Sequence, residues 1–112
     1  MLNLEFTLEQ EMLREAVKGV CSTFCPKSVV RDLEDDPVGY SPEFWKQLAQ
    51  LDLLGMLIPE DQGGSGMSML DGVVLYEELG RSLAPSPHFV SAVLSAGALV
   101  RSGSAEQRSA WL

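Results

Sequence analysis

The segment from Leu57 to Arg81, LIPEDQGGSGMSMLDGVVLYEELGR, constrains the fold of this chain more than any other part of it. A short loop of proline, acidic residues and glycines leads directly into an apolar helix, which a capping box between Ser68 and Asp71 begins. Glycine tolerates the backbone angles of a tight turn, so the loop is expected to turn the chain sharply into the helix. The pattern predicts a helix from Ser68 to about Leu83. Just before the loop, residues 56–58 fit a brief buried extended piece.

Apolar periodicity and capping residues predict two helices before this segment. The first begins at Thr7, where a capping box with Gln10 is expected, and Pro26 ends it. The second begins at Ser41, has a proline in its first turn, and meets a natural stop at Gly55. Residues 32–37 between them are expected to form a solvated connection rather than a cation site, because acids without a rigid scaffold make a poor cage.

The residues after the third helix predict two more. Prolines set off the segment PHFVSAVLSAGALVRSG, which is apolar almost all round. Such a helix is expected to be buried on every side, and at roughly 14 residues it is too short to span a bilayer. A last helix begins at Ser104, and the chain stops at Trp111-Leu112 inside its amphipathic pattern. We therefore interpret residues 1–112 as one domain cut from a longer polypeptide.

The composition is that of a folded domain, with 46% hydrophobic and 21% charged residues. The sequence has no internal repeat and no strand pattern. We expect an all-α, mainly antiparallel helical bundle of about four to five helices, docked against something outside these residues.

Charge and cysteine content narrow the possible partners and surroundings. Eight basic residues against sixteen acidic ones give a net charge of -8, and such a surface repels phosphate backbones and anionic lipid. We expect no nucleic-acid partner and no membrane insertion. Acids interrupt any apolar stretch near the start, so no signal peptide is predicted and the chain is interpreted as cytoplasmic. Cys21 and Cys25 lack the spacing of a metal site and are expected to be buried free thiols.

Few residues suggest catalysis. The glycine-rich stretch 63–66 precedes a helix, as phosphate-binding loops do, but it has no nearby basic residue and no βαβ pattern, which favours a structural loop. Of the adjacent acids Glu77 and Glu78, one is expected to be solvated and the other paired with Arg81. His88 could contact a ligand, although a histidine satisfied by the backbone at a helix start is favoured. No catalytic residue and no metal ligand is predicted.

Several stretches together resemble the amino-terminal domain of the acyl-CoA dehydrogenases. FTLEQEMLREAVKGVC is similar to the family's first helix, FWKQLAQLDLLGMLIPEDQGGSG to its second helix and following loop, and LYEELGRSLAPSP to the end of its third. GSAEQRSAWL is similar to the run that leads towards the family's β-domain. The combination of PE-x-x-GG-x-G, EELGR and G-S-x-E-Q is more specific than any one of these motifs.

The resemblance implies an FAD-dependent oxidoreductase that removes two hydrogens across the α and β carbons of an acyl-CoA thioester, with electron-transfer flavoprotein as acceptor. FAD and the catalytic glutamate would lie mainly in a middle β-domain and a carboxy-terminal helical domain outside this segment. LAPSP further resembles actinobacterial members, some of which act on steroid or other bulky thioesters. This segment would supply a wall of the acyl pocket, with substrate-binding residues Ser86, Phe89, Val90, Val93, Leu94 and Gly97.

Gly97 stands out without the resemblance as well. A glycine inside a helix costs roughly 1 kcal/mol relative to alanine, so something must favour its lack of a side chain. Close packing of a neighbouring helix is the simpler explanation, and close approach of a ligand is the alternative.

Three interpretations of the whole protein stay open at this point. The favoured one is a catalytic dehydrogenase in a homo- or hetero-oligomer. The second is a non-catalytic structural subunit of a hetero-oligomeric acyl-CoA dehydrogenase, and the third is a free-standing helical interaction module. The sequence beyond Leu112 would discriminate among them, because the expected base lies outside this segment.

Overall fold

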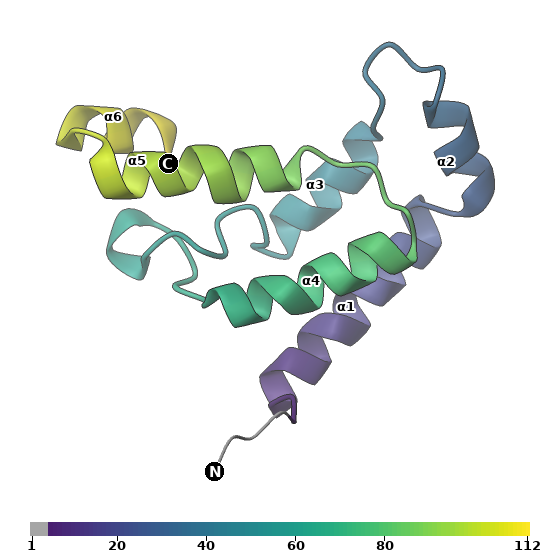
Figure 1. The fold of residues 1–112 in the computed structure, drawn as a ribbon, viewed down its shortest axis with the longest axis horizontal. Helices are drawn as coiled ribbons and strands as arrows, with labels where there is room; N and C mark the ends of the chain where they lie inside the picture. The colour runs from purple at the N-terminus through teal and green to yellow at the C-terminus, as the bar shows by residue number, and fades with distance from the viewer. Residues whose placement is uncertain (1–4) are drawn as a thin grey trace.

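The computed structural model describes residues 5–112, and every regular element in that range is a helix (Figure 1). The all-α prediction is confirmed, with six α-helices in the described range against the four or five expected. The elements are α1 (Leu8–Phe24), α2 (Lys27–Leu33), α3 (Pro42–Gln50), the 3₁₀ turn η1 (Glu60–Gln62), α4 (Met69–Arg81), the π-helical segment η2 (Phe89–Ser95), α5 (Ala96–Ser102) and α6 (Ala105–Trp111).

The predicted helix starts are confirmed by the capping contacts. Reciprocal capping boxes are formed at Thr7, Ser68 and Ser104. The Ser41 side chain accepts a hydrogen bond from the backbone N–H of Phe44 at 3.3 Å. These contacts satisfy amides that would otherwise lack an intrahelical partner, which explains why the helices begin at these residues.

The predicted end of the second helix is wrong. Helix α3 ends at Gln50, well before Gly55. Asp52 takes the left-handed conformation with φ 60°, and the Leu53 N–H donates to the Leu48 carbonyl at 3.0 Å. An acid can occupy this region because its short polar side chain tolerates left-handed backbone angles. The glycine was therefore not needed to stop the helix.

Helix α2 was not predicted. Residues 32–37 were expected to form a solvated connection, and the residues before them show no apolar periodicity or capping pattern that indicates a helix. It has seven residues, no side-chain cap and no buried residue. A helix this short and exposed carries little periodic signal. The solvated connection is confirmed only after α2 ends at Leu33, where Asp36 accepts hydrogen bonds from two following backbone amides.

The core lies between α1, α3 and α4. Helix α1 packs against both other helices, and α3 runs opposite to α1 in Figure 1. The buried cluster draws on these three helices, on the end of α1 and on the loop after α3; its members are Leu13, Val17, Cys21, Cys25, Phe44, Leu48, Leu53, Met56, Val74, Leu75 and Leu79.

The loop before α4 is held by its own backbone. Met56 and Ile58 are buried as predicted, but residues 54–57 form turns rather than an extended piece. Gly63 and Gly66 have φ of 89° and 64°, a region that favours glycine. A Cβ on Gly64 would collide with the carbonyl of Ile58. These contacts confirm that the glycines serve a sharp turn.

Segments η2 and α5 form one continuous helical run, residues 89–102, which we name the wall helix. It runs opposite to α4 in Figure 1. The prediction that it is buried on every side is wrong, because only Ala92 and Ala96 in it are buried. Phe89, Val90 and Leu94 are 50%, 61% and 53% exposed. Val93, Gly97, Leu99 and Val100 are half-buried, so the described residues cover the wall helix only in part.

Candidate functional site

Two grooves flank the wall helix. The first, which we name the glycine groove, has a volume of about 610 Å³. On the wall helix it is lined by Val93, Leu94 and Gly97 among others, and across from them by residues 57–59, Met67 and Met69. Apart from Arg101 and Ser102 at its end, this lining is apolar. The groove therefore suits an apolar chain or ring, and it brings together three of the six residues predicted to bind substrate.

Gly97 does not serve helix packing within the described chain. A Cβ added at this position meets no heavy atom within 4 Å among the described residues. The simpler explanation of Gly97, close packing of a neighbouring helix, therefore finds no support in this part of the chain. An open glycine in an otherwise apolar groove leaves the alternatives of a ligand or of a polypeptide outside these residues.

The second groove lies on the other side of the wall helix and has a volume of about 690 Å³. We name it the serine groove, because Ser91 and Ser95 line it together with Leu99. Its opposite side is formed by residues 54–63, and Gln62 has a buried side-chain oxygen without a hydrogen-bond partner among the described residues. A buried acceptor without a partner is costly, so it marks a place where a donor is missing.

The other three predicted site residues do not join the glycine groove. Ser86 and Phe89 line a smaller hollow of about 310 Å³ at the end of α4. The Ser86 hydroxyl accepts a hydrogen bond from the His88 backbone at 3.3 Å, and the Phe89 ring lies edge-on to Tyr76 with centroids 6.0 Å apart. Val90 is 61% exposed and lines none of these three hollows.

His88 is satisfied by the protein, as favoured from the sequence. Its side chain is 1% exposed, and both ring nitrogens have partners. The Nε2 atom lies 2.8 Å from the Leu53 carbonyl oxygen and the Nδ1 atom 2.6 Å from the Tyr76 hydroxyl. Burial lowers the pKa of His88 below its ordinary value of 6.5. The imidazole is therefore neutral at pH 7.

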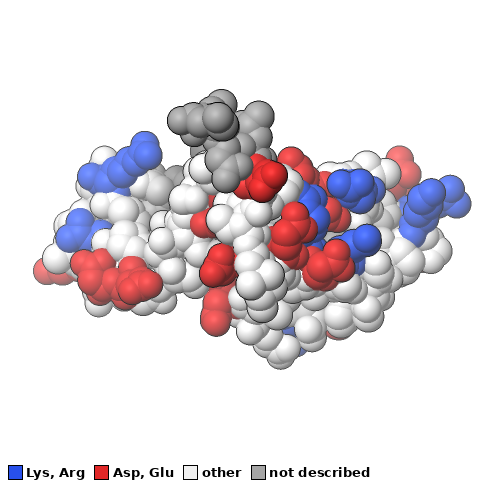
Figure 2. All heavy atoms as spheres, turned by 90° about the horizontal axis from the view of Figure 1, so that it is seen from below, with Lys and Arg blue, Asp and Glu red and all other residues white. Residues whose placement is uncertain are grey.

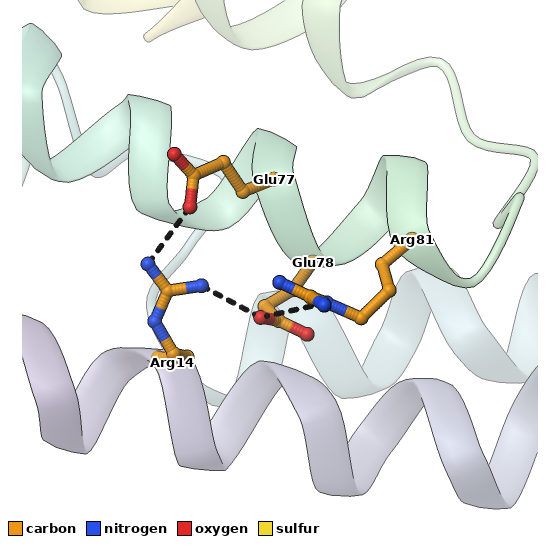
Figure 3. A network of polar contacts seen from close by, with 4 residues as sticks. All are labelled: Arg14, Glu77, Glu78 and Arg81. Carbon is orange, nitrogen blue, oxygen red and sulfur yellow. Dashed lines mark hydrogen bonds and ion pairs between the residues drawn. The ribbon is translucent and has the colours of Figure 1, made fainter.

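A charged network joins α1 to the end of α4 (Figure 3). Arg14 reaches between the two acids and contacts Glu77 at 2.8 Å and Glu78 at 2.7 Å. Arg81 lies 3.4 Å from the same Glu78 oxygen. The expected split is confirmed, since Glu77 is 46% exposed and Glu78 only 2%. Hydrogen bonds to Glu77 and Glu78 raise the pKa of Arg14, and the ion pairs join α1 to α4.

Comparison with known proteins identifies the domain. Residues 7–112 match the family model described as acyl-CoA dehydrogenase, N-terminal domain. The chain belongs to the acyl-CoA dehydrogenase family. Acyl-CoA dehydrogenase IpdE2 of Mycolicibacterium smegmatis is 36% identical over 80 residues, which cover 70% of this chain and 26% of that protein. This chain spans about a quarter of the length of such relatives.

Two solved structures share the fold. The crystal structure of the ChsE4–ChsE5 complex from Mycobacterium tuberculosis matches with a TM-score of 0.88 and 31% identity, covering 98% of this chain and 30% of that one. A variant of the Tcur3481–Tcur3483 steroid ACAD matches with a TM-score of 0.80 and 31% identity, covering 89% of this chain and 27% of that one. The predicted family and fold are thus both confirmed.

The glycine-rich loop does not fit the phosphates of FAD, the cofactor that the family implies. The glycine-rich loop is the only stretch with the sequence character of a phosphate cradle, and its amides are already used. The N–H groups of residues 63–67 all donate to backbone carbonyls, those of Gly64 and Gly66 to Pro59 and Ile58 at 3.1 and 2.9 Å. An anion site needs free amides pointing at the ligand. The glycine-rich loop therefore offers the flavin phosphates no such site.

The two cysteines are not reactive thiols either. Cys21 and Cys25 are buried, as predicted, and burial raises the pKa of Cys25 to about 11. A thiol with so high a pKa is not a nucleophile at neutral pH.

Within residues 5–112 no group of three His, Cys, Asp or Glu side chains could hold a metal ion. None of the helices in this range has the length and apolar character needed to cross a membrane.

Charged side chains of both signs lie on the face shown in Figure 2. Figure 2 shows acidic and basic side chains interspersed with uncharged surface on the face seen from below. On that face the acidic side chains do not form one continuous patch.

Three features of the folded domain were not predicted from the sequence. Arg14 is separated from its acidic partners by more than 60 residues, so no local spacing could pair them. The Gln62 acceptor has no sequence signature. The serine pair was visible, because Ser91 and Ser95 lie four apart on an apolar helix, the spacing of one helical face. That spacing could have marked the serine groove.

Proposed function

We propose that this chain is the N-terminal domain of an FAD-dependent acyl-CoA dehydrogenase that introduces a double bond between the α and β carbons of an acyl-CoA thioester. The proposal rests chiefly on the family match over residues 7–112, combined with the wall helix. That helix presents large apolar side chains to open grooves, which is the surface an acyl group requires.

Within that function the domain binds and shields the substrate. We assign the acyl group to the glycine groove, where Val93, Leu94 and Gly97 would contact it and exclude water. Ser86, Phe89 and Val90 would extend this surface where another domain completes it. The described residues contain no free base beside the grooves, and FAD, which accepts the hydride when bound, would be held by other regions.

The serine groove is the second candidate for the acyl group. The Ser91 and Ser95 hydroxyls favour it, because both are exposed and can accept a hydrogen bond from a substrate that carries a donor. An unsubstituted fatty chain offers no such donor. The glycine groove therefore fits a plain acyl or ring surface better, and the serine groove fits a hydroxylated one.

Substrate class and assembly are also part of the proposal. The two solved structures carry the names of two chains each, and one is described as a steroid ACAD. We propose a bulky or steroid-derived thioester as substrate, an oligomer of like or unlike subunits, electron-transfer flavoprotein as acceptor and a cytoplasmic location.

The test uses the complete protein, expressed with any partner subunit. Flavin absorbance after purification and reduction of an artificial electron acceptor are measured with short, branched and steroid-derived acyl-CoA substrates. We expect bound flavin and thioester-dependent reduction. Bound flavin without turnover of any thioester would contradict the enzyme and favour the non-catalytic subunit, for which the two-chain solved structures are the supporting observation. Absence of flavin would favour the interaction module.

A further inference from the structure

Three elements meet at the His88 side chain. It lies directly before the wall helix, against Tyr76 of α4 and against Leu53 in the loop after α3. The Tyr76 ring is edge-on to the imidazole, with centroids 5.4 Å apart. No other residue of the described chain joins these three elements through side-chain hydrogen bonds on both ring nitrogens.

The two hydrogen bonds fix the tautomer and the ring orientation. The Leu53 carbonyl can only accept, so Nε2 of His88 carries the hydrogen and donates to it. Nδ1 is then bare and accepts from the Tyr76 hydroxyl. Burial raises the pKa of Tyr76 to about 12, so this hydroxyl keeps its proton at neutral pH. The ring cannot flip without losing both contacts, and neither nitrogen is free for chemistry.

The contact to Leu53 connects the two sides of the serine groove. Leu53 directly precedes Leu54 and Gly55, which line that groove opposite the wall helix. Its own N–H is held by the Leu48 carbonyl at the end of α3. A bond from His88 to the Leu53 carbonyl therefore ties the start of the wall helix to the loop that faces it.

The wall helix has few other anchors. Only Ala92 and Ala96 in it are buried, and a methyl side chain makes few contacts. Two prolines with a serine between them precede His88. Each proline fixes its own φ angle, but it has no backbone N–H and so donates no hydrogen bond that would hold the helix. The position of the wall helix thus depends strongly on His88.

We propose that His88 is a positioning residue that sets the separation between the wall helix and the loop after α3, and thereby the size of acyl group that the grooves accept. This inference rests on the proposed function for its effect on specificity, but its effect on the helix does not. His88 is not catalytic, because it acts through the wall helix and touches no reacting atom.

Three variants of the complete protein test the proposal. His88→Leu removes both hydrogen bonds, and His88→Gln keeps a donor for the Leu53 carbonyl. Val17→Ala is the matched control, because Val17 is fully buried in α1 and lies in the core away from the wall helix. Hydrogen exchange is followed by mass spectrometry in peptides from residues 89–102 and from α1, and kcat/KM is measured for a bulky and a short acyl-CoA.

The expected pattern separates positioning from simple destabilisation. His88→Leu should raise exchange in residues 89–102 at least about tenfold while α1 stays protected, because the wall helix opens locally. It should also change the bulky-to-short ratio of kcat/KM by roughly tenfold, since small displacements of a binding wall are costly. His88→Gln should bring both the exchange and the substrate ratio back towards the wild-type values. Val17→Ala should lower the melting temperature and leave the ratio unchanged.

Exchange in His88→Leu that is unchanged, or that rises equally in α1 and the wall helix, would overturn the proposal. An unchanged substrate ratio with selective opening of the wall helix would overturn its specificity part. If the wild-type protein oxidises no thioester, the proposed function is wrong, and the exchange data alone decide whether His88 positions the helix.

Discussion

The substitution Gly97→Leu separates the two explanations of this glycine. A Cβ at position 97 has no heavy atom within 4 Å among the described residues, so a side chain can start there without a clash, and the groove leaves room for the rest of it. Replacing a glycine inside a helix recovers roughly 0.5–1 kcal/mol of helix propensity. We therefore expect the melting temperature of the complete protein to stay the same or to rise by a few degrees.

Activity should respond differently from stability. The leucine side chain would project into the glycine groove of about 610 Å³, beside Val93 and Leu94. If that groove holds the acyl group, kcat/KM for a steroid-sized thioester should fall by roughly 10- to 200-fold, the range that one misplaced apolar group produces in a pocket. Short acyl-CoA substrates, which leave part of the groove empty, should lose much less.

Ser95→Leu is the matched variant for the opposite groove. It adds the same side chain to the same helix but lines the serine groove instead. Selective loss with Ser95→Leu and none with Gly97→Leu would move the acyl group to the serine groove. An equal loss of kcat/KM on every substrate, together with a large fall in melting temperature for Gly97→Leu, would refute the reasoning. Gly97 would then pack against a part of the protein outside the described residues.

Three further predictions concern stability of the complete protein, each followed by thermal unfolding. Gly64→Ala should destabilise by roughly 1–3 kcal/mol because the new methyl collides with the Ile58 carbonyl, whereas Gly19→Ala, with nothing within 4 Å, should stabilise slightly; equal effects would contradict the loop packing. Because the pKa of His88 is lowered in the folded chain, the unfolded chain takes up this proton first as the pH falls. The contribution of His88 to stability is therefore fully present above pH 6.5 and is lost below it. His88→Gln should flatten the dependence of the melting temperature on pH between 7 and 5, and an unchanged slope would contradict this reasoning. Trp111 is 77% exposed in this chain and should be covered in the complete protein, so Trp111→Ala should lower the melting temperature by several degrees, and no change would place it in solvent.

The sequence predicted the features that local chemistry controls. Capping boxes at Thr7, Ser68 and Ser104 involve side chains three residues apart, so helix starts could be read directly. The turn at Gly63 and Gly66 was equally local, since positive φ angles are encoded by residue type. The family resemblance added the fold and the approximate position of the wall helix.

What the sequence could not predict depends on contacts distant in the chain. Periodicity describes how apolar a helix is but not how many neighbours it has, so the wall helix was wrongly expected to be buried all round. Its first half, residues 89–95, is π-helical and has a different residue period, so α-helical spacing could not tell which of these residues share a face. The contact of Arg14 with Glu78, and that of His88 with Leu53, required the folded structure.

The uneven burial of large side chains explains how a small domain can be stable and still leave a binding surface open. Phe44, Leu48 and Met56 are fully buried in the core, and each such side chain contributes roughly 1.5–3 kcal/mol. The wall helix buries only two alanines, whose transfer from water contributes much less. The free energy of folding therefore resides mainly in α1, α3, α4 and the loop after α3. Substitutions in the wall helix can then alter which ligand is accepted at little cost to the fold, while the hydrogen bonds of the single residue His88 keep that helix in register with the core.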